Sequence, residues 1–171
     1  MARTEDLLPA TREAIIQVCY LAFQEEDFFN LFSYIPAGGR HFLAYRGAEV
    51  VSHAVVTTRW LQPEGLPLLK TAYVDAVATL PACQGQGYSS AVLQHLAQNI
   101  SDYEIAGLQT DIPDFYRRLG WELWRGPLAG RSQTGLVPTP EQKGVMILRL
   151  PQTPPLDLDR LLTVEVAGRI W

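Results

Sequence analysis

The 171-residue chain is long enough for one domain with a sizeable core, and its 47% hydrophobic and 19% charged residues are typical of a soluble globule. No apolar run approaches the roughly 20 residues that span a bilayer, and the first residues lack the apolar core of a signal peptide, so we expect a cytoplasmic protein without a membrane segment. The net charge of −4 disfavours a nucleic-acid partner, and Cys19 and Cys83 form neither a disulfide framework nor a metal-type spacing, so no metal is expected.

Helical spacing of apolar residues predicts a helix over residues 9–24, and a second short helix is expected over residues 25–35, before Pro36 and the following glycines. Residues 41–61 read as a β-hairpin with its turn at Arg46-Gly47. Residues 68–80 are rich in apolar and β-prone residues, which predicts a central strand.

The second half of the chain alternates between strand and helix patterns. Apolar positions from Ala91 to Ile100 predict a helix, residues 103–110 a strand, residues 111–121 a short helix, and residues 121–126 and 144–151 two strands separated by a long loop. A hairpin followed by strand–helix–strand crossovers predicts an α/β fold of the α+β type. We expect a single domain over residues 1–171, with a mixed, mostly antiparallel sheet of six or seven strands flanked by about four helices.

Two glycines, Gly85 and Gly87, stand where the central strand passes into a helix, in "CQGQGYSS". A helix N-terminus exposes main-chain N–H groups without internal partners, and glycines there let the backbone approach an anion. A plain turn explains two glycines equally well. A Walker loop is excluded because no Gly-Lys-Ser/Thr follows, and the Rossmann pattern fails at Ser90.

This stretch resembles the acetyl-CoA loop of the GNAT acetyltransferase superfamily, Gln/Arg-x-x-Gly-x-Gly/Ala after the fourth strand. Gln84 and Gly87 match, whereas Ser89 stands where glycine or alanine is usual. "DFYRRLGW" resembles the family's helix after the fifth strand. The resemblance implies a sheet that splays between the fourth and fifth strands and a site for acetyl-CoA. The implied cofactor-binding residues are Val77, Ala78, Gln84, Gly85, Gln86, Gly87, Tyr88 and Ser89.

Four longer stretches are similar to the bacterial aminoglycoside 2'-N-acetyltransferases, which implies a role in antibiotic resistance and a homodimer. They are "YVDAVATLPACQGQGYSSAVL", "FYRRLGWELWRGP", "TPEQKG" and "AGRIW". The similarity implies that Asp75 takes the amine proton, that Tyr116 protonates the leaving thiolate, and that Asp27, Glu141 and Trp171 contact the cationic substrate. Two acids of that family are replaced here, by Gln142 and Arg169, which leaves the acceptor open.

Acetyl transfer to an amine requires a base for the ammonium proton, N–H donors for the carbonyl oxygen, and a proton for the thiolate. Strand alternation places Asp75 and Val77 on one face, so a carboxylate is expected beside the carbonyl site. Asp75 has an alternative interpretation as a structural ion-pair partner, and Tyr116 as a core residue with a bonded hydroxyl.

Other polar residues are interpreted as structural. Cys83 has no histidine near it in sequence and is expected to fill space in the core. His53 is expected to be a partly buried histidine with its bonds satisfied, and His41 and His95 surface or edge residues. Three functions remain: acetylation of an aminoglycoside or similar amino sugar, acetylation of another small amine, polyamine or peptide N-terminus, and non-catalytic acyl-CoA binding.

Overall fold

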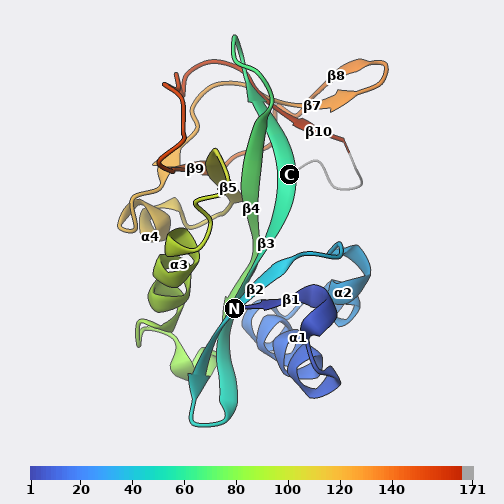
Figure 1. The fold of residues 1–171 in the computed structure, drawn as a ribbon, viewed down its shortest axis with the longest axis vertical. Coiled ribbons are helices and arrows are strands. Elements are labelled where there is room, and N and C mark those ends of the chain that lie inside the picture. Colours follow the sequence, from blue (N-terminus) through green and yellow to red (C-terminus); the bar gives the residue numbers. More distant parts are fainter. Residues whose placement is uncertain (167–171) are drawn as a thin grey trace. The chain divides into compact units, whose positions relative to one another are not determined.

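The computed structural model describes residues 1–166, which divide into two compact units (Figure 1). The first unit contains Met1–Thr57 and Val74–Asn99, and the second contains Thr58–Tyr73 and the described residues from Ile100 onward. Strands β3 (Glu49–Pro63) and β4 (Leu69–Thr79) contribute residues to both units. No helix within residues 1–166 is both long and apolar enough to cross a membrane.

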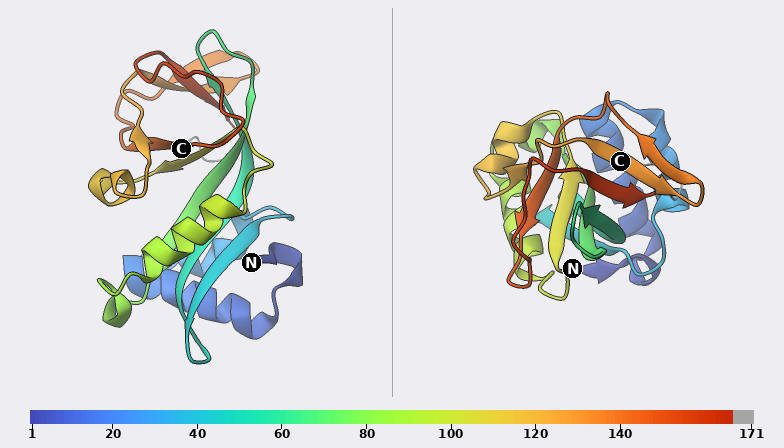
Figure 2. Two further views of the ribbon diagram at one scale, coloured as in Figure 1. Left: turned by 60° about the vertical axis from the view of Figure 1, so that its left-hand side comes forward. Right: turned by 90° about the horizontal axis from the view of Figure 1, so that it is seen from above.

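The first unit combines a small set of paired strands with helices. Besides its parts of β3 and β4, its elements are β1 (Ala2–Arg3), the 3-10 helix η1 (Thr4–Asp6), α1 (Pro9–Phe23), η2 (Glu26–Asn30), α2 (Leu31–Tyr34), β2 (Arg40–Arg46), η3 (Pro81–Cys83) and α3 (Tyr88–Gln98). Strand β2 pairs antiparallel with both β1 and β3, and its register with β3 shifts between Ala44 and Tyr45. Helix α3 packs alongside β2 in this unit (Figure 2).

Local sequence explains where α1 begins and ends. Pro9 occupies the first turn, where its missing N–H group is not needed. Ile15 and Cys19 are fully buried and lie on the apolar stripe that faces the core. The chain leaves the helix at Gln24, which adopts a left-handed conformation and donates its N–H to the carbonyl of Tyr20 at 2.7 Å. The helix predicted over residues 9–24 is thus confirmed.

The strands of the second unit belong to one mixed sheet. In addition to its parts of β3 and β4, it contains β5 (Ile105–Gln109), α4 (Pro113–Arg117), β6 (Glu122–Leu123), β7 (Leu128–Ser132), β8 (Gly135–Pro138), β9 (Val145–Arg149) and β10 (Leu162–Glu165). Its strand order is β6-β9-β5-β4-β3-β10-β7-β8. The parallel register of β4 with β5 runs from the pair Thr71–Ile105 to the pair Tyr73–Gly107. This short ladder agrees with the predicted splay between the fourth and fifth strands.

The predicted fold class is confirmed, with one correction to the number of strands. Residues 1–166 hold four α-helices, as expected, but ten strands rather than six or seven. The predicted loop over residues 127–143 contains the β7–β8 hairpin, and β10 lies in the tail. Strand β8 is exposed along its whole length, so it lacks the apolar alternation by which a strand is recognised in a sequence.

Candidate active site

Strand β4 carries a kink at the position where the base is predicted. Ala76 has a φ of +49°, a left-handed conformation that is unusual for a residue with a Cβ. Asp75, Ala76 and Val77 are all half-buried, whereas Ala78 is buried. Because alternation of side chains requires an extended backbone, the strict alternation that places Asp75 and Val77 on one face does not hold across the left-handed Ala76. The two residues still flank the kink directly.

The glycine joint forms an exposed loop that leads into α3. Gly85 and Gly87 have φ values of +73° and +85°, and a Cβ built on either would meet nothing within 4 Å. Gly87 is the N-cap of α3, and no side chain bonds to the first turn from that position. The first turn of α3 thus begins without a side-chain cap from Gly87, beside glycines that leave open space, an arrangement that fits a pyrophosphate.

A chain of hydroxyl groups ties the start of α3 to β4. The Ser89 and Thr79 hydroxyl oxygens lie 2.6 Å apart, and Thr79 lies 2.8 Å from the hydroxyl of Ser52. Ser52 in turn donates to the carbonyl of Ala78 at 2.9 Å. The hydroxyl of Ser89, where the family usually has glycine or alanine, is thereby satisfied inside the unit.

Tyr116, the predicted acid, lies on the short helix α4 in the second unit. Its side chain is buried, and its ring packs edge-on against that of Trp121 with centroids 6.0 Å apart. Burial raises the pKa of the Tyr116 hydroxyl to about 12, so the group is protonated at neutral pH. Pro113 begins the helix, as its position in the sequence predicts.

The predicted substrate-binding residues come from separate parts of the chain. Asp27 is exposed on η2, and Glu141 is exposed beyond β8. The neighbouring Gln142 donates its side-chain amide to the carbonyl of Lys143 at 3.2 Å. Trp171 lies outside the described residues.

The structure brings only some of the predicted residues together. Asp75, Val77, Ala78 and the loop from Gln84 to Ser89 follow one another within the first unit. Asp27 belongs to that unit as well, whereas Tyr116 and Glu141 belong to the second.

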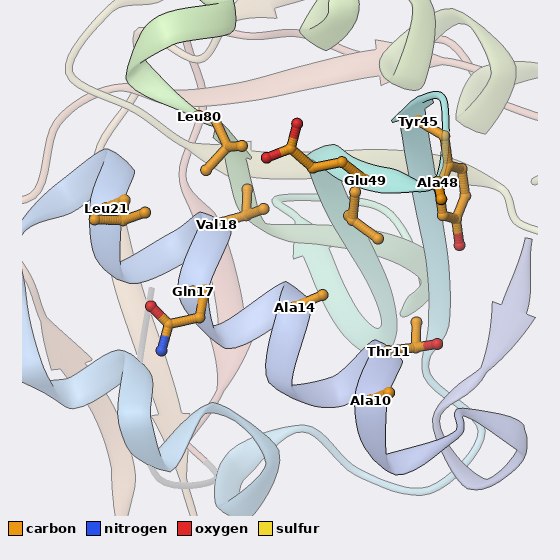
Figure 3. Close-up of a pocket in the computed structure, with 11 residues that line it drawn as sticks. Ala10, Thr11, Ala14, Gln17, Val18, Leu21, Tyr45, Ala48, Glu49 and Leu80 are labelled. Carbon is orange, nitrogen blue, oxygen red and sulfur yellow. The ribbon is translucent and has the colours of Figure 1, made fainter.

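A pocket of about 390 Å³ lies elsewhere in the first unit, between α1 and the β2–β3 hairpin (Figure 3). Its walls are mostly small or apolar, with Gln17 and Glu49 among the polar exceptions. Thr11 and Tyr45 also line it, as does Leu80, which directly follows β4. Among the predicted catalytic, cofactor-binding and substrate-binding residues that the structure describes, none lines this pocket.

The histidine predictions are only partly right. His95 is exposed on α3 and His53 has its bonds satisfied, although it is fully buried rather than partly buried. The prediction for His41 is wrong, because this side chain is also fully buried and bonds to His53. Both cysteines are buried and free, which agrees with the predicted role of Cys83 in the core.

Sequence reasoning missed the residues that hold the kink and the loop. Ala76, Ser52 and Thr79 carry no chemical group that marks a site, and an alanine gives no sign of a left-handed conformation. The sequence predicts that His53 has its hydrogen bonds satisfied, but its bond to the Ala76 carbonyl on β4 depends on a kink that the sequence does not reveal.

A mixed sheet in which the fourth strand leads through a glycine-lined loop into a helix is the fold that this chain shares with N-acetyltransferases of known structure. Residues 6–124 match the acetyltransferase (GNAT) domain, and the chain belongs to this family. The protein is therefore an acyltransferase that uses acetyl-CoA.

One curated relative supports this assignment, and solved structures of N-acetyltransferases share the fold. The aminoglycoside 2'-N-acetyltransferase of Mycolicibacterium fortuitum is 30% identical over 181 residues, covering 100% of this chain and 90% of the relative. Among solved structures, the GNAT family N-acetyltransferase YhbS of Escherichia coli, in complex with CoA, has a TM-score of 0.64 at 14% identity and covers 93% of this chain and 86% of its own. Eis1 of Mycobacterium abscessus has a TM-score of 0.63 at 21% identity over 71% of this chain, which spans only 32% of Eis1.

Proposed function

We propose that the protein transfers the acetyl group of acetyl-CoA to the 2'-amino group of an aminoglycoside or a similar amino sugar. The observation that carries this proposal is the 30% identity with an aminoglycoside 2'-N-acetyltransferase over the whole of this chain. The net charge of −4 suits a polycationic small molecule. We further propose that residues 1–171 act as one acetyltransferase domain in the cytoplasm, as a homodimer, and contribute to antibiotic resistance.

The cofactor brings an activated acetyl group, and the chain's own residues bind and orient it. We assign the pyrophosphate to the amides of the loop from Gln84 to Ser89, where Gly85 and Gly87 allow close approach. Main-chain groups at Val77 and Ala78, beside the kink, are assigned to the acetyl carbonyl.

Two side chains move protons in this proposal. Asp75, half-buried beside the kink, accepts a proton from the substrate ammonium group so that the nitrogen becomes nucleophilic. Tyr116 keeps its proton at neutral pH, because burial raises its pKa to about 12, and gives it to the departing thiolate. No enzyme nucleophile is needed, because the amine attacks the thioester directly when both are held in place.

Substrate binding is assigned to carboxylates that face ammonium groups. Asp27 and Glu141 are exposed and free to approach a soluble cation, and Trp171 is proposed as a third contact. Gln142 replaces an acid of the aminoglycoside enzymes and bonds to its own main chain. That replacement favours, as a second candidate, an acceptor with fewer ammonium groups, such as a polyamine or a peptide N-terminus.

The test is a thiol-release assay with purified protein, acetyl-CoA and a matched pair of drugs. Kanamycin B carries an amine at the 2' position and kanamycin A a hydroxyl, so the first is expected to react and the second not to react at that position. Mass and NMR analysis of the product identifies the acetylated nitrogen. Equal turnover of both drugs would refute the 2' assignment, and turnover of spermidine or a peptide without drug turnover would establish the second candidate.

A further inference from the structure

A buried line of polar side chains runs through the first unit to the kink in β4. The Thr4 hydroxyl lies 3.1 Å from Nε2 of His41, and Nδ1 of His41 lies 2.9 Å from Nε2 of His53. Nδ1 of His53 lies 2.9 Å from the carbonyl oxygen of Ala76. Both histidines have no exposed surface, and Cys19 lies beside His53 with its sulfur 3.7 Å from Nδ1.

The chemistry of the partners fixes the direction of these bonds. A carbonyl oxygen only accepts, so Nδ1 of His53 carries the proton and donates to Ala76. In the neutral ring Nε2 of His53 then accepts from the Nδ1–H group of His41. Nε2 of His41 is left as an acceptor beside the Thr4 hydroxyl, which also lies 3.2 Å from the carbonyl oxygen of Gly39 and can donate to either. Burial lowers the pKa of His41 to about 4 and that of His53 to about 3, so both rings are neutral at physiological pH.

Ala76 adopts a conformation that needs such support. At a φ of +49° its Cβ crowds the following carbonyl, a strain that persists only where the surroundings fix it. The bond from His53 to the Ala76 carbonyl holds that peptide unit in place. An extended backbone at this position would turn the carbonyl to another direction and break the bond.

We propose that His53, backed by His41, is a positioning residue that holds the left-handed conformation of Ala76 and so fixes Asp75 and Val77 for acetyl transfer. This inference rests on the proposed function, in which Asp75 and Val77 take part in the reaction. His53 does not touch the reacting atoms, since its Nδ1 bonds to a main-chain carbonyl. Its loss therefore affects the acetyl transfer step and leaves the cofactor loop, which begins at Gln84, able to bind CoA.

Three variants at one position separate this role from simple core filling. His53→Asn places an amide nitrogen near the position of Nδ1 and keeps the bond to Ala76, whereas His53→Gln places it near Nε2 and loses that bond. His53→Leu fills the same space without a donor. We expect kcat to fall about 5- to 30-fold in the Leu and Gln variants, because the strain of Ala76, about 1–2 kcal/mol, is no longer opposed by a hydrogen bond. In the Asn variant, which keeps that bond, kcat should fall less than threefold, that is by less than about 0.7 kcal/mol. The KM for acetyl-CoA should stay within about twofold of the wild type.

A second background tests whether the effect passes through the kink. Ala76→Gly removes the Cβ and with it the cost of a left-handed conformation. In that background we expect His53→Leu or His53→Gln to lower kcat less than threefold. An equal loss of kcat in both backgrounds, or a loss in the Asn variant as large as in the Leu variant, would overturn the proposal. If the Leu variant does not fold, as judged by circular dichroism, the Gln variant carries the same comparison.

An NMR measurement keeps this inference distinct from the proposed function. In isotopically labelled protein without acceptor, the Nδ1–H proton of His53 should be slow to exchange, and the amide shifts of Val77 should move in the Leu and Gln variants but not in the Asn variant. The exposed His95, changed to Leu, is the control and should leave the Val77 amide unshifted. If no amino sugar is acetylated but these shifts behave as described, the proposed substrate fails while the positioning role stands. Unchanged Val77 shifts in every variant would refute the positioning role whatever the acceptor.

Discussion

The left-handed conformation of Gly87 gives a quantitative test of the cofactor loop. Its φ is +85°, and a Cβ added there meets nothing within 4 Å, so Gly87→Ala introduces no clash. The cost is conformational and amounts to about 1–2 kcal/mol for a residue with a Cβ in this region. Residues 84–87 are exposed, so the unliganded loop can relax at little expense.

Because the free loop can relax, most of that cost should arise when CoA selects the strained conformation. We expect the Kd for CoA to rise about 5- to 30-fold, which corresponds to 1–2 kcal/mol, with a smaller change in the free energy of unfolding. Isothermal titration calorimetry measures the first quantity and urea denaturation the second.

Gly65 supplies a matched control, because it has a φ of +82° and the same open surroundings but lies in the turn between β3 and β4. Gly65→Ala should lower the free energy of unfolding by up to about 1–2 kcal/mol and leave the Kd for CoA unchanged. An unaltered Kd in Gly87→Ala, or an equal rise in Gly65→Ala, would refute the assignment of the loop to the pyrophosphate.

Three further predictions follow from the site and from the buried histidines. Asp75→Asn should lower kcat about 10²- to 10⁴-fold with CoA affinity unchanged by calorimetry, and full activity would show that another group takes the proton. Tyr116→Phe should lower kcat, and because the raised pKa of about 12 keeps Tyr116 protonated, the wild-type rate should not fall through loss of this proton between pH 7 and 10. A fall in the wild-type pH–rate profile near pH 8 that is absent in the Phe variant would contradict this. His41 and His53 have folded pKa values near 4 and 3 against 6.5 in the unfolded chain, so the free energy of unfolding should fall by about 1.4 kcal/mol per pH unit for each ring as the pH drops below 6.5. In urea denaturation, His41→Asn should show a weaker dependence of the free energy of unfolding on pH, and an unchanged dependence would refute the assignment.

The parts of the fold with strong periodicity could be predicted, and the parts without it could not. Helix α1, the hairpin and β4 were placed from apolar spacing because each has one face or both faces buried. The β7–β8 hairpin was missed because β8 is exposed throughout, and β10 because the segment before it is broken by prolines. The cofactor loop was found from Gly85 and Gly87, whose positive φ values are what glycine permits.

The buried state of His41 escaped prediction because it depends on partners from three separate segments. Thr4 precedes α1, His53 lies across the hairpin on β3, and Phe32 packs its ring 5.6 Å from that of His41. A polar residue is buried when it finds such partners, and their meeting is a property of the fold rather than of the local sequence. The hairpin gave a partial signal, since it was predicted to bring residues of β2 beside those of β3.

Consecutive residues of β3 hold alternate carbonyls of the segment of β4 that we assign to the reaction. Ser52 donates to the carbonyl of Ala78 at 2.9 Å, and His53 to that of Ala76 at 2.9 Å. Both donors have no exposed surface, so neither bond competes with water and each is worth more than an exposed one. Ser52 also reaches Ser89 through Thr79, so the same part of β3 fixes both the kink and the start of α3. A buried polar group that loses its partner is costly, so we expect His53 to hold the geometry of the proposed acetyl site and Ser52, through Thr79, to hold that of the proposed pyrophosphate site.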